Sequence, residues 1–245
     1  MDVQQTTGFI VWITGMRRSG KSALAQLLAT KFAAAGRRVE LLDEDGAAKV
    51  LLEGLGASKE DHAKAVARLG FAAKAIMRNG GIALCAALSP YRDARDQLRK
   101  EARRFVEVFV DCSMEKLQQR DPEGVYRRAL AGELKEVPGI DAPYEPPGHA
   151  DIVVHSDQVN VADAAMRVFQ SLVDLKYVGP TEFGRLTGGQ RPRRGKPGKA
   201  GKGGKGGKAG RAKKAKASAG KKGPARAAAR RAPRKAAART AKSRR

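Results

Sequence analysis

The sequence has few aromatic residues, and its C-terminal end has no acidic residue at all. Aromatic residues make up 5% of the 245 positions, and the last of them is Phe183. From residue 189 to residue 245 there are 23 Lys and Arg but no Asp or Glu. Because this segment combines low hydrophobicity with charge of a single sign, we predict that it is disordered.

Without that segment the charge is nearly balanced. The chain has 49 Lys and Arg against 25 Asp and Glu, and removing the 23 C-terminal cations leaves 26 basic residues against all 25 acidic ones. We therefore expect a near-neutral globular body over residues 1–178, a flexible Gly/Lys-rich linker over 179–209 and an Ala/Lys/Arg-rich tail over 210–245. A cationic tail without interleaved aromatics predicts non-specific nucleic-acid binding, with a merely solubilising tail as the alternative.

Cysteine and long apolar runs are also scarce. The two cysteines, Cys85 and Cys112, have neither a C-x-x-C partner nor a His/Cys cluster, so we expect buried free thiols and no zinc site. No apolar run approaches the ~18 residues of a membrane span, and the polar N-terminus lacks the pattern of a signal peptide. These absences predict a cytoplasmic protein with no membrane partner.

One motif indicates what the body binds. Residues 15–22 read G-M-R-R-S-G-K-S and fit the phosphate-binding pattern G-x-x-x-x-G-K-[S/T], with an apolar run before them and a helix-forming run after them. Backbone N–H groups of such a loop face a phosphate at the positive end of a helix. We expect ATP and Mg²⁺ here, with Lys21 on the β/γ-phosphates and Ser22 on the metal. The predicted ATP-binding residues are Gly15, Met16, Arg17, Arg18, Ser19, Gly20, Lys21 and Ser22.

Apolar runs of strand length alternate with helical patterns as far as residue 178. Strands are expected at residues 9–14, 39–43, 82–88, 105–111 and 151–154, and helices at 21–35, 47–55, 59–79, 92–104, 113–120, 125–131 and 161–175. This alternation predicts an α/β domain of three layers with a central parallel sheet. The proline-rich stretch 132–147 is expected to be a lid loop.

Carboxylates follow the second expected strand, at the edge where ligands of parallel sheets bind. Asp43 and Asp45 are candidates for orienting or deprotonating an acceptor, and Asp43 for binding Mg²⁺; helix capping or a solvated loop is the alternative role. Lys135, with Arg127 and Arg128, is expected to close over the phosphates from the lid side or, equally, to lie on a solvated helix face.

Several further runs, in order along the chain, resemble the adenylylsulfate (APS) kinase family over about residues 8–175. The most specific are S-P-Y-R at 89–92 and G-I-D-A-P-Y-E-P-P at 139–147, together with A-G-E-L-K at 131–135. The resemblance implies a P-loop kinase fold and transfer of the ATP γ-phosphate to the 3′-hydroxyl of adenylylsulfate to make PAPS. It also implies a mobile lid and often a homodimer. It adds Ser89 to the catalytic residues, alongside Lys21, Asp43 and Asp45, and Arg120 to the ATP site.

The chain departs from the family pattern mainly on the acceptor side. The family run D-G-D-x-V-R reads D-E-D-G-A-A at 43–48, N-I-R-R reads A-V-A-R at 65–68, and Ala57 and Val137 stand where the family has aromatics; Arg18 replaces a P-loop glycine. A lost stacking ring or charged hydrogen bond weakens binding by about 1–3 kcal/mol. We therefore expect weaker adenylylsulfate binding unless other side chains substitute. The predicted acceptor-binding residues are Lys49, His62, Arg68, Arg92 and Lys135.

Two alternatives stay open because of these departures. One is a P-loop kinase with a different acceptor. The other is a non-catalytic nucleotide-binding body that the basic tail tethers to nucleic acid.

Overall fold

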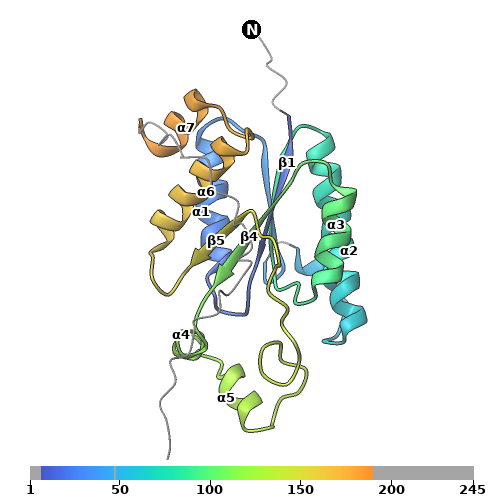
Figure 1. The fold of residues 1–245 in the computed structure, drawn as a ribbon. Helices are drawn as coiled ribbons and strands as arrows, with labels where there is room; N and C mark the ends of the chain where they lie inside the picture. Colours follow the sequence, from blue (N-terminus) through green and yellow to red (C-terminus); the bar gives the residue numbers. More distant parts are fainter. Residues whose placement is uncertain (1–6, 47, 190–245) are drawn as a thin grey trace, which may run out of the picture. The chain divides into compact units, whose positions relative to one another are not determined.

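A parallel sheet of five strands forms the centre of the domain (Figure 1). The computed structural model describes residues 7–46 and 48–189. The strands are β1 (Phe9–Thr14), β2 (Val39–Asp43), β3 (Ile82–Ala87), β4 (Phe105–Asp111) and β5 (Ile152–His155), in the order β2-β3-β1-β4-β5. All neighbouring strands pair in parallel. The carboxyl ends of the strands therefore meet at one edge of the sheet, where ligands bind in such folds.

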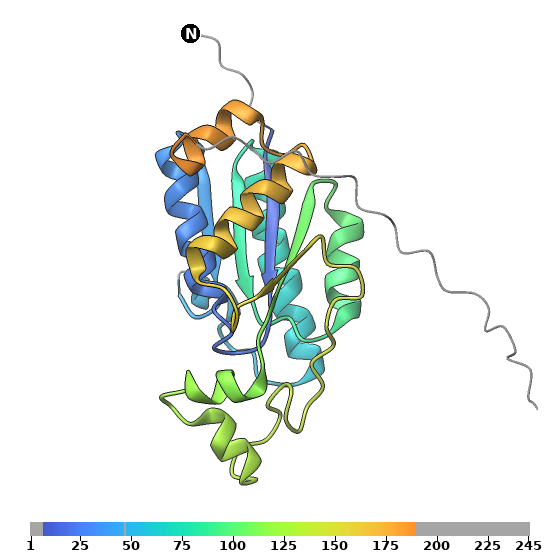
Figure 2. The ribbon, with the colours of Figure 1, turned by 60° about the vertical axis from the view of Figure 1, so that its left-hand side comes forward.

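Helices cover both faces of the sheet, as Figures 1 and 2 show. Helices α1 (Lys21–Ala34), α6 (Val161–Asp174) and α7 (Pro180–Thr187) lie on one face, and α2 (Lys59–Arg78) and α3 (Arg92–Glu101) on the other. The short helices α4 (Met114–Gln119) and α5 (Val125–Leu130) lie beyond the carboxyl ends of the strands. A 3₁₀ turn, η1 (Lys49–Leu52), follows β2.

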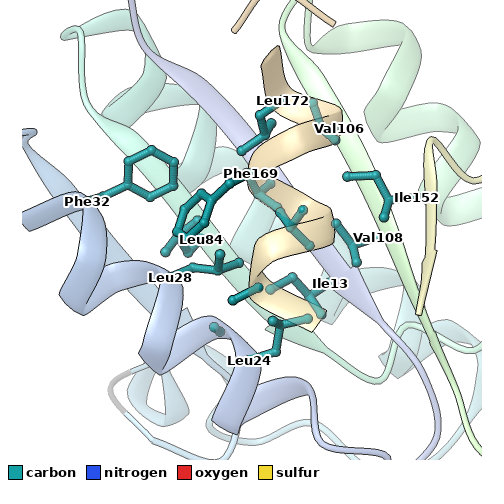
Figure 3. Packing of buried hydrophobic residues seen from close by; sticks show 14 of the residues in the cluster. Ile13, Leu24, Leu28, Phe32, Leu84, Val106, Val108, Ile152, Phe169 and Leu172 are labelled. Carbon is teal, nitrogen blue, oxygen red and sulfur yellow. The ribbon is translucent and has the colours of Figure 1, made fainter. Parts of the chain in front are cut away.

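The central strand β1 divides its side chains between two apolar cores. Phe9, Val11 and Ile13 pack with α1 and α6, and Figure 3 shows Ile13 beside residues of both helices. Ile10 and Trp12 point the opposite way, into the cluster under α2 and α3. Successive side chains of a strand alternate between faces. A strand buried on both faces is therefore a continuous apolar run, as residues 9–13 are here, with the buried Thr14 as the polar end of the strand.

The predicted three-layer architecture is confirmed, and each predicted strand agrees with the observed one to within a residue at each end. Two predicted elements were wrong. The helix expected over residues 47–55 is only the turn η1 in its described part. Helix α7 occupies part of the expected linker, and its Phe183 and Leu186 are buried in the core. The rest of the predicted linker and the tail lie outside the described residues.

A buried ion pair fixes α7 to the domain. Arg37 Nη1 lies 2.6 Å from Glu182 Oε1, and both side chains are largely buried. Within the described ranges, no helix has the length and apolar composition needed to cross a membrane.

Candidate active site

The P-loop, residues 15–22, connects β1 to α1 at the carboxyl edge of the sheet. Two of its positions require glycine. Gly20 precedes the first turn of α1 with φ of 101°, a conformation that side chains disfavour. A side chain at Gly15 would place its Cβ 2.5 Å from the carbonyl oxygen of Val110. The loop therefore curls against the sheet edge and aims the N-terminus of α1 at whatever binds there.

Lys21 holds its ammonium group inside this loop. The side chain is buried, and Nζ donates a hydrogen bond to the carbonyl of Met16 at 3.0 Å. Burial lowers the pKa of Lys21, while the carboxylates of Glu44, Asp45 and Asp43 act in the opposite direction. Lys21 and the carboxylates after β2 therefore lie at the same edge of the sheet. A cation in this environment favours an anionic ligand.

The sequence reasoning missed Glu44. Its Oε1 accepts a hydrogen bond from the Leu88 amide at 2.7 Å, which ties the end of β2 to the segment after β3. Burial raises the pKa of Glu44, and the charge of Lys21 is the first factor that opposes this rise. Asp43 instead accepts from the Asp45 amide at 3.3 Å, and Asp45 is exposed. The sequence signal for Glu44 was its place in the middle of the D-E-D run at 43–45, where the family pattern has glycine.

Two arginines of the P-loop contact the segment between α4 and α5. Arg18 Nη2 lies 2.6 Å from Glu123 Oε1, and Arg17 Nη2 lies 3.8 Å from Glu123 Oε2. The Tyr126 hydroxyl donates to the carbonyl of Arg17 at 2.8 Å. Arg18 adopts φ of 61°, which is unfavourable for a residue with a side chain. The predicted ATP-binding Arg17 and Arg18 thus already have an anionic partner, another residue that sequence reasoning missed.

A cavity of about 320 Å³ adjoins the P-loop on the α1 and α6 side. Its lining includes Arg18, Ser19, Gly20 and Arg120, along with apolar residues of β4, β5 and α6. Arg120 is held there by the carbonyl of Ser156 at 2.8 Å. The Ser19 hydroxyl is buried and, within the described part of the chain, has no hydrogen-bond partner. The structure thus places the predicted Arg120 beside the phosphate loop, next to a space suited to an apolar ring.

Ser89 follows the end of β3 and contacts the end of β1. Its hydroxyl is buried, accepts from Trp12 Nε1 at 3.1 Å and donates to Thr14 Oγ1 at 2.8 Å. Because both interactions are internal, the geometry favours a positioning role for Ser89 under the end of β1 over participation in phosphate transfer.

The predicted lid loop, residues 132–147, is docked against the S-P-Y-R segment and β1. The Tyr144 hydroxyl lies 3.1 Å from Thr14 Oγ1, and the Glu145 amide donates to the Pro90 carbonyl at 2.8 Å. The Arg92 amide donates to Glu145 Oε2 at 2.8 Å, and its guanidinium to the Pro146 carbonyl at 2.9 Å. Arg92 therefore holds the lid loop in place in this conformation.

The other predicted acceptor residues have separate surroundings. Arg68 donates to the carbonyls of Leu51 and Glu53 at 3.0 and 3.1 Å and so braces η1. The ring of His62 lies 6.0 Å from that of Tyr91. Lys49 and Lys135 are exposed. The structure shows no contact that joins these side chains into one cluster within the described residues.

A phosphate loop after the central strand, carboxylates after β2 and a lid loop over the same edge define a P-loop kinase, a phosphotransferase that uses a nucleotide. The chain belongs to the adenylylsulphate kinase family, whose model matches residues 7–155. It is 39% identical over 173 residues to an adenylyl-sulfate kinase of Picosynechococcus sp., covering 71% of this chain and 98% of that protein. It is 42% identical over 172 residues to a probable bifunctional SAT/APS kinase 2 of Sorangium cellulosum, covering 70% of this chain but only 30% of that longer protein.

A solved structure agrees with this assignment. The Mycobacterium tuberculosis APS kinase CysC, in complex with AMPPNP and APS, matches with a TM-score of 0.64 and 34% identity, over 68% of this chain and 98% of that one.

Proposed function

We propose that this chain transfers the γ-phosphate of ATP to the 3′-hydroxyl of adenylylsulfate, giving ADP and PAPS. The observation that carries the proposal is the buried Lys21 inside an intact P-loop, with three carboxylates acting on its charge, in a chain of this family. The loop amides and Lys21 would bind the β- and γ-phosphates, as electrostatic stabilisation of phosphoryl transfer requires. The cavity beside Arg120 would take the adenine ring.

The remaining polar residues fit the other tasks of this reaction. Asp43 and Asp45 are the candidates for orienting the attacking hydroxyl and accepting its proton. Ser22 and Asp43 would hold Mg²⁺, which neutralises phosphate charge when bound. No group of three or more His, Cys, Asp or Glu in the described ranges is arranged to hold a metal ion. Proteins usually bind magnesium through one or two carboxylates together with substrate phosphates and water.

The test is an assay of the full chain with ATP, Mg²⁺ and adenylylsulfate, in which PAPS is measured by chromatography. Lys21→Ala is expected to lower the rate by about 10²–10³-fold, the loss typical when a donor to transition-state charge is removed. Lys31→Ala, in the last turn of the same helix, is the matched control and should keep full activity. If the unaltered chain forms no PAPS at millimolar adenylylsulfate, the proposed acceptor is wrong.

A different acceptor is the second candidate, and two observations favour it. Ala48, at the position of the family's arginine, is only 1% exposed and packs in the apolar cluster beneath α2. Arg68 is engaged with the carbonyls of η1. A screen that measures ADP release with a panel of hydroxyl-bearing metabolites would identify such an acceptor. Faster ADP release with adenylylsulfate than with every other compound would contradict this candidate.

A further inference from the structure

The segments that lead into the strands form a cationic edge of the domain, opposite the P-loop. Because the strands are parallel, the segments before them meet at the amino edge of the sheet. Residues 35–38, 78–81 and 102–104 lead into β2, β3 and β4, and residues 175–179 lead into α7, at the same end of the domain (Figure 1). These four segments contain no Asp or Glu but six cations, which are Arg37, Arg38, Arg78, Arg103, Arg104 and Lys176.

Contacts of the backbone and of one ring hold these segments side by side. The Ile82 amide of β3 donates to the Arg38 carbonyl at 2.8 Å, and the Ile10 amide of β1 donates to the Arg104 carbonyl at 2.8 Å. The Arg104 guanidinium lies 4.8 Å from the ring centroid of Tyr177, in the turn before α7. Neighbouring strands lie about 4.8 Å apart, so the segments before β2 and β4 are about 14 Å apart across the edge. Over about that length, duplex DNA carries about eight phosphates.

Most of the positive charge at this edge is not neutralised by acidic residues. Arg37 pairs with Glu182 at 2.6 Å. The exposed Glu40 and Asp174 flank the edge, so three acids stand against six cations and three positive charges remain in excess. The cations that are exposed and have no carboxylate partner among the described residues, here called the amino-edge arginines, are Arg38, Arg78 and Arg103.

The helix dipole accounts for only one of the amino-edge arginines. Arg78 lies in the last turn of α2, where the partial negative charge of the helix end favours a cation. Arg38 and Arg103 lie beyond the ends of α1 and α3, outside the last turn of either helix. Their placement favours the binding of an external anion over the stabilisation of a helix.

We propose that the amino-edge arginines bind the phosphate backbone of double-stranded nucleic acid, together with the cations that follow α7. The Arg37–Glu182 ion pair holds α7 at this edge, and the cationic segment 189–245 follows that helix directly in the chain. The one aromatic residue of the four segments, Tyr177, packs on Phe9 with ring centroids 5.2 Å apart, so it offers no free ring to a base. Contact with phosphates therefore carries the interaction, without reading of the bases.

Fluorescence anisotropy of the full chain with a short labelled duplex, over a series of salt concentrations, tests the inference. We expect Arg38→Gln, Arg78→Gln and Arg103→Gln, combined in one chain, to reduce the slope of log K against log salt by about 2–3 in magnitude, since each neutralised phosphate contributes about 0.9. The same three positions changed to Lys should keep the slope. Three contacts alone give a weak complex, so the edge acts only together with the C-terminal cations.

The matched control removes the same charge from the opposite end of the domain. It combines Lys49→Gln, Arg127→Gln and Lys135→Gln, all at exposed positions, and should change the slope by less than about 0.9. An unchanged slope in the amino-edge variant overturns the inference, and so does an equal change in both variants, which would mean that net charge alone matters. Loss of binding to anionic phospholipid vesicles with the DNA slope unchanged would assign a membrane surface and also overturn it.

Discussion

The exposed carboxylate of Glu123 is the acidic partner of both P-loop arginines. It is the anionic partner of Arg18 at 2.6 Å and of Arg17 at 3.8 Å, so it competes with phosphate for both guanidinium groups. Its side chain is 58% exposed, which limits the contribution of these pairs to about 1 kcal/mol. Glu123→Gln should therefore tighten the binding of Mg²⁺·AMPPNP by up to about fivefold, as measured by calorimetry.

The control for this variant is Glu101→Gln. Glu101 of α3 pairs with Lys74 of α2, outside the P-loop, so its loss should not change nucleotide affinity. Equal affinity of Glu123→Gln and the unaltered chain would mean that the two arginines do not reach the phosphates.

His62 gives the folded domain a specific dependence on acid. Burial lowers its pKa, against the opposing effect of the Asp61 and Glu136 carboxylates. Below about pH 6.5 the unfolded chain takes up a proton at this residue that the folded chain does not, so the free energy of unfolding falls as the pH decreases. His62→Gln should flatten the decline measured by urea unfolding between pH 7.5 and 5. His149 is exposed, so His149→Gln should leave the decline unchanged. If the free energy of unfolding depends equally on pH in the wild type and in both variants, His62 is not the source of the acid dependence.

At the scale of single residues, the sequence predicted the groups that belong to a contiguous motif. Lys21 begins α1 and Asp43 ends β2, at the positions that the P-loop and the strand pattern indicate, and their roles stay predictions. Glu44 and Glu123 were missed because their partners lie far away in the chain, at Leu88 and at Arg18. Arg68 was assigned to the acceptor site because it stands at the last arginine of the family run N-I-R-R, while the structure shows it bound to the Leu51 carbonyl of η1.

The buried guanidinium of Arg95 joins helix α3 to β4, to the lid loop and to the segment after β3. Arg95 donates to Glu107 on β4 at 3.0 Å, to the carbonyl of Glu145 in the lid loop at 2.6 Å, and to the carbonyl of Ser89. The side chains of Arg95 and Glu107 are 1% and 4% exposed. Arg95→Met should lower the free energy of unfolding by at most about 3–5 kcal/mol, because the buried Glu107 carboxylate loses its buried partner and keeps only Arg99.

Urea unfolding checks this expectation. Arg95→Met combined with Glu107→Leu removes both charges and should recover part of the loss, since an apolar pair avoids the desolvation of two ions. The exposed Arg103→Met is the control. A double variant less stable than Arg95→Met would contradict the explanation.

At the scale of elements, patterns of apolar residues gave the strands almost completely. The order of the strands was not predicted, since any strand buried on both faces reads as the same apolar run. Helix α7 was missed because it follows a glycine and precedes a cationic segment, so its burial depends on tertiary contacts of Phe183 and Glu182. The expected helix after β2 is shortened to η1, where carbonyls accept hydrogen bonds from Arg68.

On the scale of the whole molecule, the chain joins a near-neutral body to a segment with 23 cations and no anions. We propose that this segment binds nucleic acid through its phosphates, without reading the sequence. Binding of the full chain to duplex DNA should weaken steeply with salt, each neutralised phosphate adding about −0.9 to the slope of log K against log salt. Gel-shift titrations over a salt series on two unrelated duplexes would give equal affinities and equal slopes.

A chain that ends at residue 189 tests the proposed kinase reaction and the proposed nucleic-acid binding separately. This shorter chain retains every described element, including the P-loop, the lid loop and helix α7 with its Arg37–Glu182 ion pair. Its kinase rate should therefore equal that of the full chain. Its charge no longer favours polyanions, because 26 basic residues face 25 acidic ones, and DNA binding should be lost. Undiminished DNA binding would place the nucleic-acid surface on the body instead. A slower kinase rate would mean that the C-terminal segment contributes to catalysis.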